Sequence, residues 1–258
     1  MHNLHIYPGA LKSEEDGELL YRCLRSHQPI LPQAADLGEI PLIIRHQHKL
    51  PVCTGEAGAY LRAVLQYQKY GQILDFSGMF IYKMNRLYYD GLKPQTRGST
   101  LKATMQTLCG RGVCLEETYR TDYRTLREPF PKKKYGTYLR REAANYRLPG
   151  FARIIDLDDM LLALADERPV IFSLIIYTDF YEAKEGIVAP KISGRKIGGH
   201  SMVALGYDME CELVKVVQSW GKDKWGPTDE GYMYIPFERF RGALSSGTPH
   251  LIEAYCAI

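Results

Sequence analysis

The sequence lacks several features that would place it in other classes of protein. No apolar run approaches the ~18 residues of a membrane-spanning helix, and the longest, residues 169–177, is typical of a buried strand. The first residues lack the charged and apolar regions of a secretory signal. The net charge of +3 is too small to indicate nucleic-acid binding. We therefore expect a cytoplasmic globular protein that binds neither membranes nor nucleic acids.

The cysteines indicate a reducing environment rather than disulfides or a metal site. Six cysteines are present, and without a secretory signal they need not pair. Cys109 and Cys114 stand close together, but no second Cys or His pair at zinc-like spacing accompanies them. We expect free thiols, no metal ion and no other cofactor. The basic run at residues 132–134 is interpreted as a solvated loop.

The hydrophobic pattern changes along the chain from helical to strand-like. Residues 1–30 are predicted to be an N-terminal extension. Residues 31–258 are predicted to be one α+β domain, with a helical lobe over 31–150 and a mainly stranded lobe over 151–258. Helices are predicted from just after Pro51 to about Tyr70 and over residues 77–90, 100–109 and 156–165. Strands are predicted over residues 170–177, 201–207, 213–217 and 231–236.

Cys53 lies at or near the N-terminus of the first predicted helix. The unsatisfied N–H groups at a helix start carry a partial positive charge that stabilises a thiolate over a thiol. The thiolate is the nucleophilic form of cysteine, and a nearby histidine strengthens it as an ion pair. A cysteine in this setting is still more often structural than catalytic, so the hypothesis needs a histidine from elsewhere in the chain.

His200 is the candidate partner and comes from the other half of the chain. It follows Gly198-Gly199 at the start of a predicted strand, and a block rich in Trp and Gly comes soon after it. Both tryptophans of the sequence, Trp220 and Trp225, fall in this block. The combination is a stronger signal for catalysis than a lone histidine.

Together these motifs resemble those of the papain-like cysteine peptidases, in particular the bacterial and phage-type members. Cys53 lies six residues after Gln47, and His200 lies 147 residues after Cys53, inside the family's interval of roughly 130–150. The resemblance covers about residues 31–240 and suggests a bacterial or phage origin. The landmarks, in family order, are Asp36-Leu37, Arg45-His46-Gln47, Cys53-Thr54, Arg97-Gly98-Ser99, residues 112–117, residues 168–170, Gly198-Gly199-His200, Gly206-Tyr207-Asp208 and Ser219-Trp220-Gly221.

The resemblance implies a fold and a reaction. Peptide or protein substrates are hydrolysed in a cleft between a helical left lobe and an antiparallel β-barrel-like right lobe; the oligomeric state is left open. Cys53 attacks the scissile carbonyl to form a thioester, and His200 acts as general acid and base. Gln47 and the Cys53 N–H stabilise the oxyanion. Gln218 orients His200, and Trp220 shields that contact. The predicted substrate-binding residues are Gly98, Ser99, Gly199 and Trp220.

Several departures from the family pattern affect these implications. Gln218 stands where the family has Asn, and the extra methylene moves the carbonyl oxygen by more than ~1 Å unless the strand adjusts, enough to slow catalysis. Pro51-Val52 replace Gly-Ser and stiffen the approach to the nucleophile. Glu56, in the first helical turn, is interpreted as a capping glutamate. Leu50 replaces a disulfide-forming cysteine, in agreement with a reducing environment.

Two other functions remain open at this point. Gln218 and Pro51-Val52 are compatible with a pseudo-peptidase that binds peptides without cutting them. An acyl transferase or amidase could use the same Cys–His pair, and nothing in the sequence separates it from a peptidase. Because only about thirty residues precede the family-like start, no long inhibitory propeptide is expected.

Overall fold

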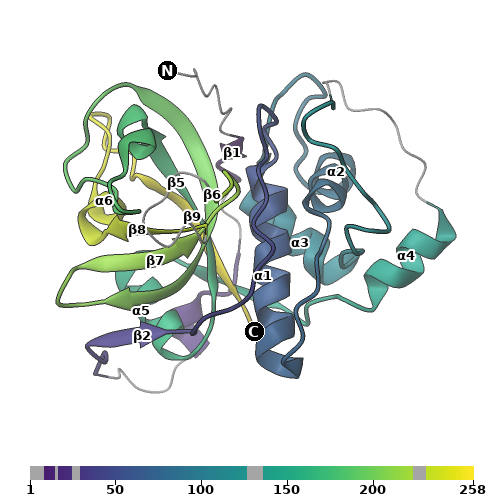
Figure 1. Cartoon of the computed structure of the whole chain (residues 1–258), viewed down its shortest axis with the longest axis horizontal. Helices are drawn as coiled ribbons and strands as arrows, with labels where there is room; N and C mark the ends of the chain where they lie inside the picture. Colours follow the sequence, from purple (N-terminus) through teal and green to yellow (C-terminus); the bar gives the residue numbers. More distant parts are fainter. Residues whose placement is uncertain (1–8, 15–16, 25–29, 127–135, 223–230) are drawn as a thin grey trace.

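The computed structural model describes residues 9–14, 17–24, 30–126, 136–222 and 231–258. Figure 1 shows a strand-rich half and a helix-rich half that meet along helix α1 (Cys53–Tyr70). The predicted α+β class is confirmed. The predicted solvated loop at residues 132–134, and Trp225, lie outside the described residues.

Two helices of the helix-rich half begin at residues whose side chains cap the helix N-terminus. The Ser77 hydroxyl accepts a hydrogen bond from the Phe80 N–H at 3.3 Å, and the Thr100 hydroxyl accepts one from the Ala103 N–H at 3.1 Å. Helix α1 ends where Gly71 adopts the left-handed conformation (φ +62°). The described helices of this half are α1, α2 (Gly78–Tyr88), α3 (Leu101–Gly110) and α4 (Thr137–Ala144).

The strand-rich half contains one large, mostly antiparallel sheet. Its main path runs β3-β1-β6-β5-β9-β4, with β2 paired to β6 and with β7 between β6 and β8. Along the described residues the sheet is not closed, so this lobe is an open sheet rather than a complete barrel. The strands are β1 (Ala10–Leu11), β2 (Ala34–Asp36), β3 (Ser99–Thr100), β4 (Phe151–Ile154), β5 (Val170–Tyr177), β6 (Lys196–Asp208), β7 (Leu213–Val217), β8 (Tyr232–Pro236) and β9 (Leu251–Ala257).

Short helices accompany the sheet. Helix α5 (Leu157–Ala165) begins where the sequence predicts, because the Asp156 carboxylate caps it by accepting a hydrogen bond from the Asp159 N–H at 2.9 Å. No helix in the described part of the chain has the length and apolar composition needed to cross a membrane. The short helices beside the sheet are η1 (Tyr21–Leu24), α5 (Leu157–Ala165), η2 (Thr178–Glu182) and α6 (Phe237–Arg241).

Strand β5 is packed on both of its faces. Ile171 belongs to the core shared with helices α1, α2 and α3, whereas Val170 and Phe172 belong to the core on the opposite face. Successive side chains of a strand point to opposite faces, so a strand buried on both sides is a continuous apolar run. This explains the apolar stretch that the sequence shows at this position.

Strand β6 begins earlier than the sequence predicts. The prediction placed the strand start at Ser201, with His200 at its mouth, but β6 starts at Lys196. Strand β5 pairs with β6 from Val170 to Tyr177, and β1 pairs with it at Gly199. The apolar pattern misses this extension because its residues, apart from Ile197, are polar or glycine and are held by backbone pairing. His200 therefore lies inside a strand.

Helices α1 and α2 approach closely at a glycine. A β-carbon at Gly55 would lie 2.2 Å from the Gly78 carbonyl oxygen, a backbone atom that cannot yield as a flexible side chain can. We expect Gly55→Ala to lower the free energy of unfolding by about 2 kcal/mol, measured by urea denaturation. The control is Gly150→Ala, whose β-carbon would meet only the Ile258 side chain, at 3.1 Å. Equal losses in both variants would contradict the prediction.

Candidate active site

Cys53 is the first residue of α1, as the sequence predicts, and is fully buried. Its thiol lies against the backbone and side chain of Ser201 and against the backbone of Gly9 and Thr54. Burial raises the pKa of the thiol, and the hydrogen bonds from these neighbours lower it only in part. The thiol is therefore protonated at neutral pH in this arrangement, even though it sits at a helix N-terminus.

His200 lies next to Ser201 on β6 and is also fully buried. Its ring stacks on Trp220, with centroids 4.4 Å apart and an interplanar angle of 26°. Burial lowers the pKa of His200 to about 3. Neither ring nitrogen makes a hydrogen bond within the described part of the chain. The Cys53 thiol thus contacts Ser201, the residue next to His200, but the imidazole is neutral and no hydrogen bond joins it to the thiol in the described part of the chain.

Gln218 directly follows β7 and is buried beside His200. Its side chain raises the pKa of His200, against the effect of burial, which places the two groups close together. Neither amide atom, however, makes a hydrogen bond of normal geometry with a described residue. Gln218 is thus a loosely placed neighbour of the imidazole.

Gln47 is held in a defined orientation. Its amide nitrogen donates to the Leu50 carbonyl at 2.8 Å, and its amide oxygen accepts from the Ser219 hydroxyl at 2.6 Å. Its backbone N–H donates to the Ser219 carbonyl at 2.8 Å. Because Ser219 lies between Gln218 and Trp220, these bonds join the segment before the nucleophile to the segment beside His200. They lock the side chain predicted to face the oxyanion.

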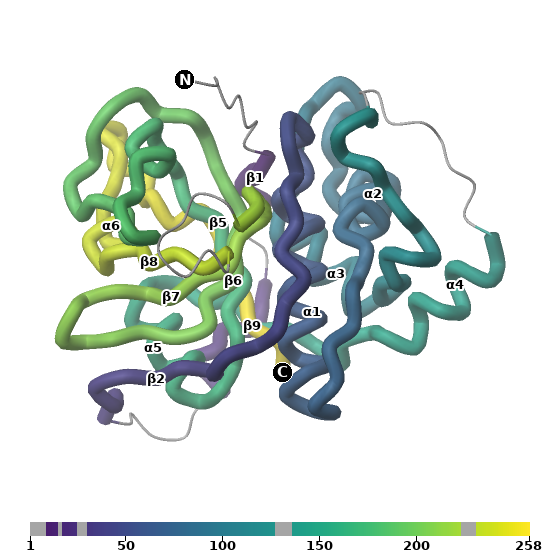
Figure 2. The backbone as a smooth tube through the Cα atoms, viewed as in Figure 1, coloured from purple at the N-terminus to yellow at the C-terminus, as the bar shows by residue number. Residues whose placement is uncertain are grey.

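Gly98, Ser99 and Gly199, the other predicted substrate-binding residues, are brought together by β1. Figures 1 and 2 show β1 at the boundary between the two halves of the molecule. It pairs in parallel with β3, Ala10 opposite Ser99, and antiparallel with β6, Ala10 opposite Gly199. The Ser99 N–H donates to the Gly9 carbonyl at 2.8 Å. The surface predicted to bind an extended substrate already carries a strand of the same chain.

Glycines permit this close approach. A β-carbon at Gly98, where φ is +95°, would lie 2.1 Å from the Gly9 carbonyl oxygen. One at Gly199 would lie 2.4 Å from the Ala10 carbonyl oxygen, and one at Gly9 would lie 2.3 Å from that of Pro51. The segment thus contacts the loop before the nucleophile and both walls beside it, which accounts for the complete burial of Cys53.

A buried ionic cluster supports the loop that carries Gln47. Arg45 lies 3.7 Å from the carboxylate of Glu56 and 3.2 Å from that of Glu116, and it also pairs with Asp75. The Tyr123 hydroxyl donates to Glu56. Burial raises the pKa of Glu116 to about 7, against the opposing charge of Arg45. The interpretation of Glu56 as a capping residue is wrong, because its carboxylate is buried in this cluster rather than bonded to the helix start.

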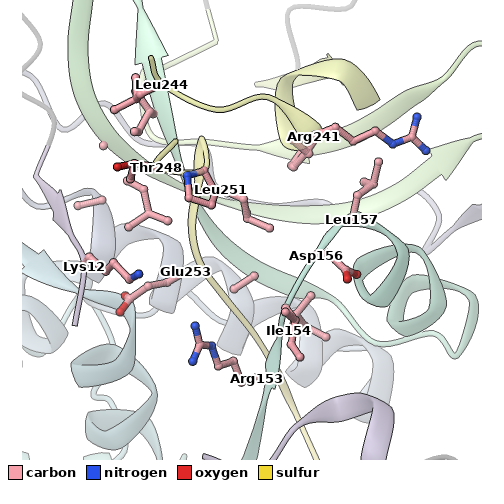
Figure 3. Close-up of a pocket in the computed structure, with 18 of the residues that line it drawn as sticks. Lys12, Arg153, Ile154, Asp156, Leu157, Arg241, Leu244, Thr248, Leu251 and Glu253 are labelled. Atoms are coloured by element: carbon pink, nitrogen blue, oxygen red, sulfur yellow. The ribbon is translucent and has the colours of Figure 1, made fainter. Parts of the chain in front are cut away.

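A pocket of about 840 Å³ opens beside β1 on the strand-rich half (Figure 3). Ala10 and Leu11 line it together with Gly199, Ile175 of β5 and apolar residues of β9. Figure 3 shows Lys12 and Glu253 at the same end of the pocket. Glu253 accepts hydrogen bonds from the Ser13 N–H at 2.7 Å and from the Leu101 N–H at 2.8 Å. This carboxylate ties the N-terminal segment and the start of α3 to β9.

The family model described as papain family cysteine protease matches residues 90–242. The chain belongs to the papain family of cysteine proteases. The matched region contains Gly98, His200, Gln218 and Trp220 and begins after Cys53. The departures around the nucleophile, Pro51-Val52 among them, lie in the part that this match leaves out.

Relatives agree with this membership. An uncharacterized peptidase C1-like protein of Acanthamoeba polyphaga mimivirus is 28% identical over 217 residues, which cover 81% of this chain and 66% of that protein. The match therefore spans just under two thirds of the relative's length. Because this relative comes from a giant virus, it does not support the expected bacterial or phage origin.

Solved structures show the papain-like fold for nearly the whole chain. Xylellain, a cysteine protease from Xylella fastidiosa, superposes with a TM-score of 0.78 at 22% identity, covering 98% of this chain and 96% of that one. Digestive procathepsin L 3 of Tenebrio molitor larval midgut superposes with a TM-score of 0.69 at 14% identity, covering 99% and 77%. At these identities the likeness concerns the fold alone.

Two residues that contact the nucleophile, Gly9 and Ser201, are not predicted from the sequence. Gly9 carries only the weak turn signal of Pro8-Gly9, and nothing in that dipeptide points to Cys53. Ser201 follows the predicted histidine, but its hydroxyl has no motif of its own. Both residues reach the thiol through strand pairing over long separations in sequence, which local patterns do not encode.

Proposed function

We propose that this papain-family chain is a cysteine endopeptidase that forms a thioester on Cys53, with His200 as general acid and base. The observation that carries the proposal is that the Cys53 thiol lies against Ser201, the residue next to His200, while Gln47 is bonded to Ser219 in the segment beside that histidine. In the covered state described above, the thiol and the imidazole are both neutral. The active state requires β1 to leave.

When β1 is displaced, Cys53 can become the thiolate that the helix N-terminus stabilises. Water then reaches both groups, burial no longer shifts their pKa values, and the proton of Cys53 passes to His200. The thiolate attacks the scissile carbonyl, while the Gln47 amide and the Cys53 N–H hold the oxyanion. His200 gives its proton to the leaving amine and then activates water for deacylation. Trp220 keeps the imidazole stacked throughout.

The direction of β1 explains why it can cover the site without being cleaved. The acyl part of a peptide substrate runs from its N-terminus toward the nucleophile. Gly9 contacts the Cys53 thiol, and the chain then runs away from the thiol along Ser99 and Thr100. With Gly98 on the acyl side, β1 therefore lies in the reverse sense of a substrate. The pocket beside β1 would receive an acyl-side side chain of the substrate once the strand leaves.

The proposal is tested by trapping the acyl-enzyme. The chain is incubated with a peptide mixture, quenched in acid and analysed by mass spectrometry. We expect acyl adducts on Cys53 and peptides cut at internal bonds with new free carboxylates, both lost in His200→Ala. With an added amine, a predominance of amide products would favour an acyl transferase instead. Peptide binding without adducts or products, even with β1 displaced, would favour the pseudo-peptidase.

Gln218→Asn tests the loose contact beside His200. Shortening the side chain by one methylene lets its amide align with the imidazole, so we expect kcat to stay the same or to rise, by up to about 10-fold. The pH profile of kcat/KM should shift with it, because the pKa of His200 depends on this amide. A fall in kcat of more than ~10-fold would show that the backbone around residue 218 is adapted to glutamine.

A further inference from the structure

A second pocket, of about 550 Å³, lies beyond Gln47 and Trp220. It is lined by His46, which precedes Gln47, and by Gly221, which follows Trp220. No described residue of β1 or β3 lines it. The two segments are joined there, because the Gly221 N–H donates to the Arg45 carbonyl at 3.0 Å and His46 forms a bridge with Trp220. The acyl side of a substrate lies along β3 and β6. This pocket is therefore on the leaving-group side.

The pocket carries surplus positive charge. Glu116 is already paired with Arg45 at 3.2 Å. Asp122 accepts from the Arg124 N–H at 3.0 Å and from the Thr125 hydroxyl at 2.9 Å. Both carboxylates therefore already have partners, and the opposing charge of Arg124 also acts on Asp122. Besides Arg124, two exposed cations line the pocket, Arg120 and Lys222. They come from opposite halves of the molecule, and neither forms an ion pair with a described residue.

Two stacked histidines form the edge of the pocket nearest the catalytic residues. The rings of His46 and His48 lie 4.2 Å apart at 19°. The His48 N–H donates to Nδ1 of His46 at 2.9 Å, which places the proton of a neutral His46 on Nε2, as a donor. His48 holds a positive φ of 51°, an unusual conformation that recurs at ligand clamps. Gly221 leaves room for the ring, since its β-carbon would lie 3.1 Å from His46 Cδ2.

We propose that this pocket binds a carboxylate on the leaving-group side of the scissile bond, between Arg120 and Lys222 and beside the histidine pair. The inference rests on the proposed peptidase function for the direction in which a substrate runs. An Arg and a Lys from opposite walls suit a carboxylate, which accepts several charge-assisted hydrogen bonds. The carboxylate is either the substrate's own C-terminus, which would favour release of short C-terminal peptides, or an Asp or Glu side chain.

The binding test uses the full chain with Cys53→Ala, so that it needs no turnover. Three small probes are titrated by calorimetry and by NMR of the histidine rings: Ala-Ala with a free C-terminus, Ala-Ala amide, and acetyl-aspartyl amide. We expect at least one carboxylate probe to bind ~10-fold more tightly than the neutral amide, and the His46 and His48 resonances to shift. Tight binding of the free acid alone identifies the C-terminus, and tight binding of the aspartyl amide identifies a side chain.

Matched variants assign the preference to the pocket. The double variant Arg120→Gln, Lys222→Gln should bring the ratio of acid to amide affinity close to one. The control Lys93→Gln, Arg140→Gln removes the same charge from exposed positions elsewhere and should keep the ratio. Equal affinity for acid and amide in the parent chain, or a preference that survives the double variant, would overturn the proposal. A carboxylate preference without any hydrolysis by the unmodified chain would leave the pocket standing and count against the peptidase.

Discussion

Gly9→Leu is expected to raise the rate at which Cys53 is alkylated at pH 6 by about 100-fold or more. A leucine side chain cannot fit where the β-carbon alone would lie 2.3 Å from the Pro51 carbonyl oxygen, so β1 must move away. The exposed thiol can then form a thiolate–imidazolium pair with His200. At pH 6 a cysteine of ordinary pKa near 8.5 is less than ~1% thiolate, whereas a paired one is mostly thiolate. Mass spectrometry of all six cysteines measures the rate at each site.

The unmodified chain should show the pH dependence of a covered site. The pKa of His200 is lowered to about 3 from an ordinary 6.5. The covered state is thus stabilised relative to the open one above pH 6.5, and this advantage is lost as the pH falls toward 3. Burial raises the pKa of Cys53, so its contribution is present below the ordinary thiol pKa of ~8.5 and is lost as the pH rises further. Protection of Cys53 should therefore be greatest between these limits.

Two variants control this experiment. Glu14→Leu places the same side chain at an exposed position of the same segment and should leave Cys53 protected. Adding His200→Ala to Gly9→Leu should remove the reactivity at pH 6 while keeping the reactivity above pH 8. If Gly9→Leu reacts only above pH 8, the strand covers the thiol but no ion pair forms beneath it. Unchanged protection in Gly9→Leu would show that β1 does not control access.

Cys53→Ala is expected to reduce peptide hydrolysis to background, a loss on the order of 10⁴- to 10⁶-fold when a nucleophile is removed. The comparison is made in the Gly9→Leu chain, where the site is open. Because no other group replaces the thiolate, kcat should fall while peptide binding persists. Removing one buried sulfur should cost about 1 kcal/mol of stability, which thermal unfolding measures.

Cys256→Ala is the matched control for this loss. Cys256 is fully buried in β9, so its removal should cost similar stability, yet hydrolysis should stay within about 3-fold of the parent. Residual hydrolysis in Cys53→Ala that exceeds the background of a His200→Ala chain would point to another nucleophile. The six cysteines are all free thiols in the structure, so each can be replaced singly without breaking a disulfide.

The sequence by itself determined the local elements around the site. The predicted helix starts at residues 53, 77, 100 and 156 are confirmed to within one residue. These features depend on residues within a few positions of one another, whose preferences can be read directly. The family resemblance likewise depended on short motifs in a fixed order, and the matched region from residue 90 to residue 242 bears it out.

The tertiary structure alone decided the state of the site. The cover over Cys53 comes from Gly9 and β1, held by backbone hydrogen bonds to β3 and β6 between segments far apart in sequence. The partner of Glu56 is Arg45, eleven residues before it and across a loop. The neutrality of His200 arises from burial by residues distant in sequence. Solvent access and long-range pairing depend on how distant segments pack together, and a local pattern of residues does not predict this packing.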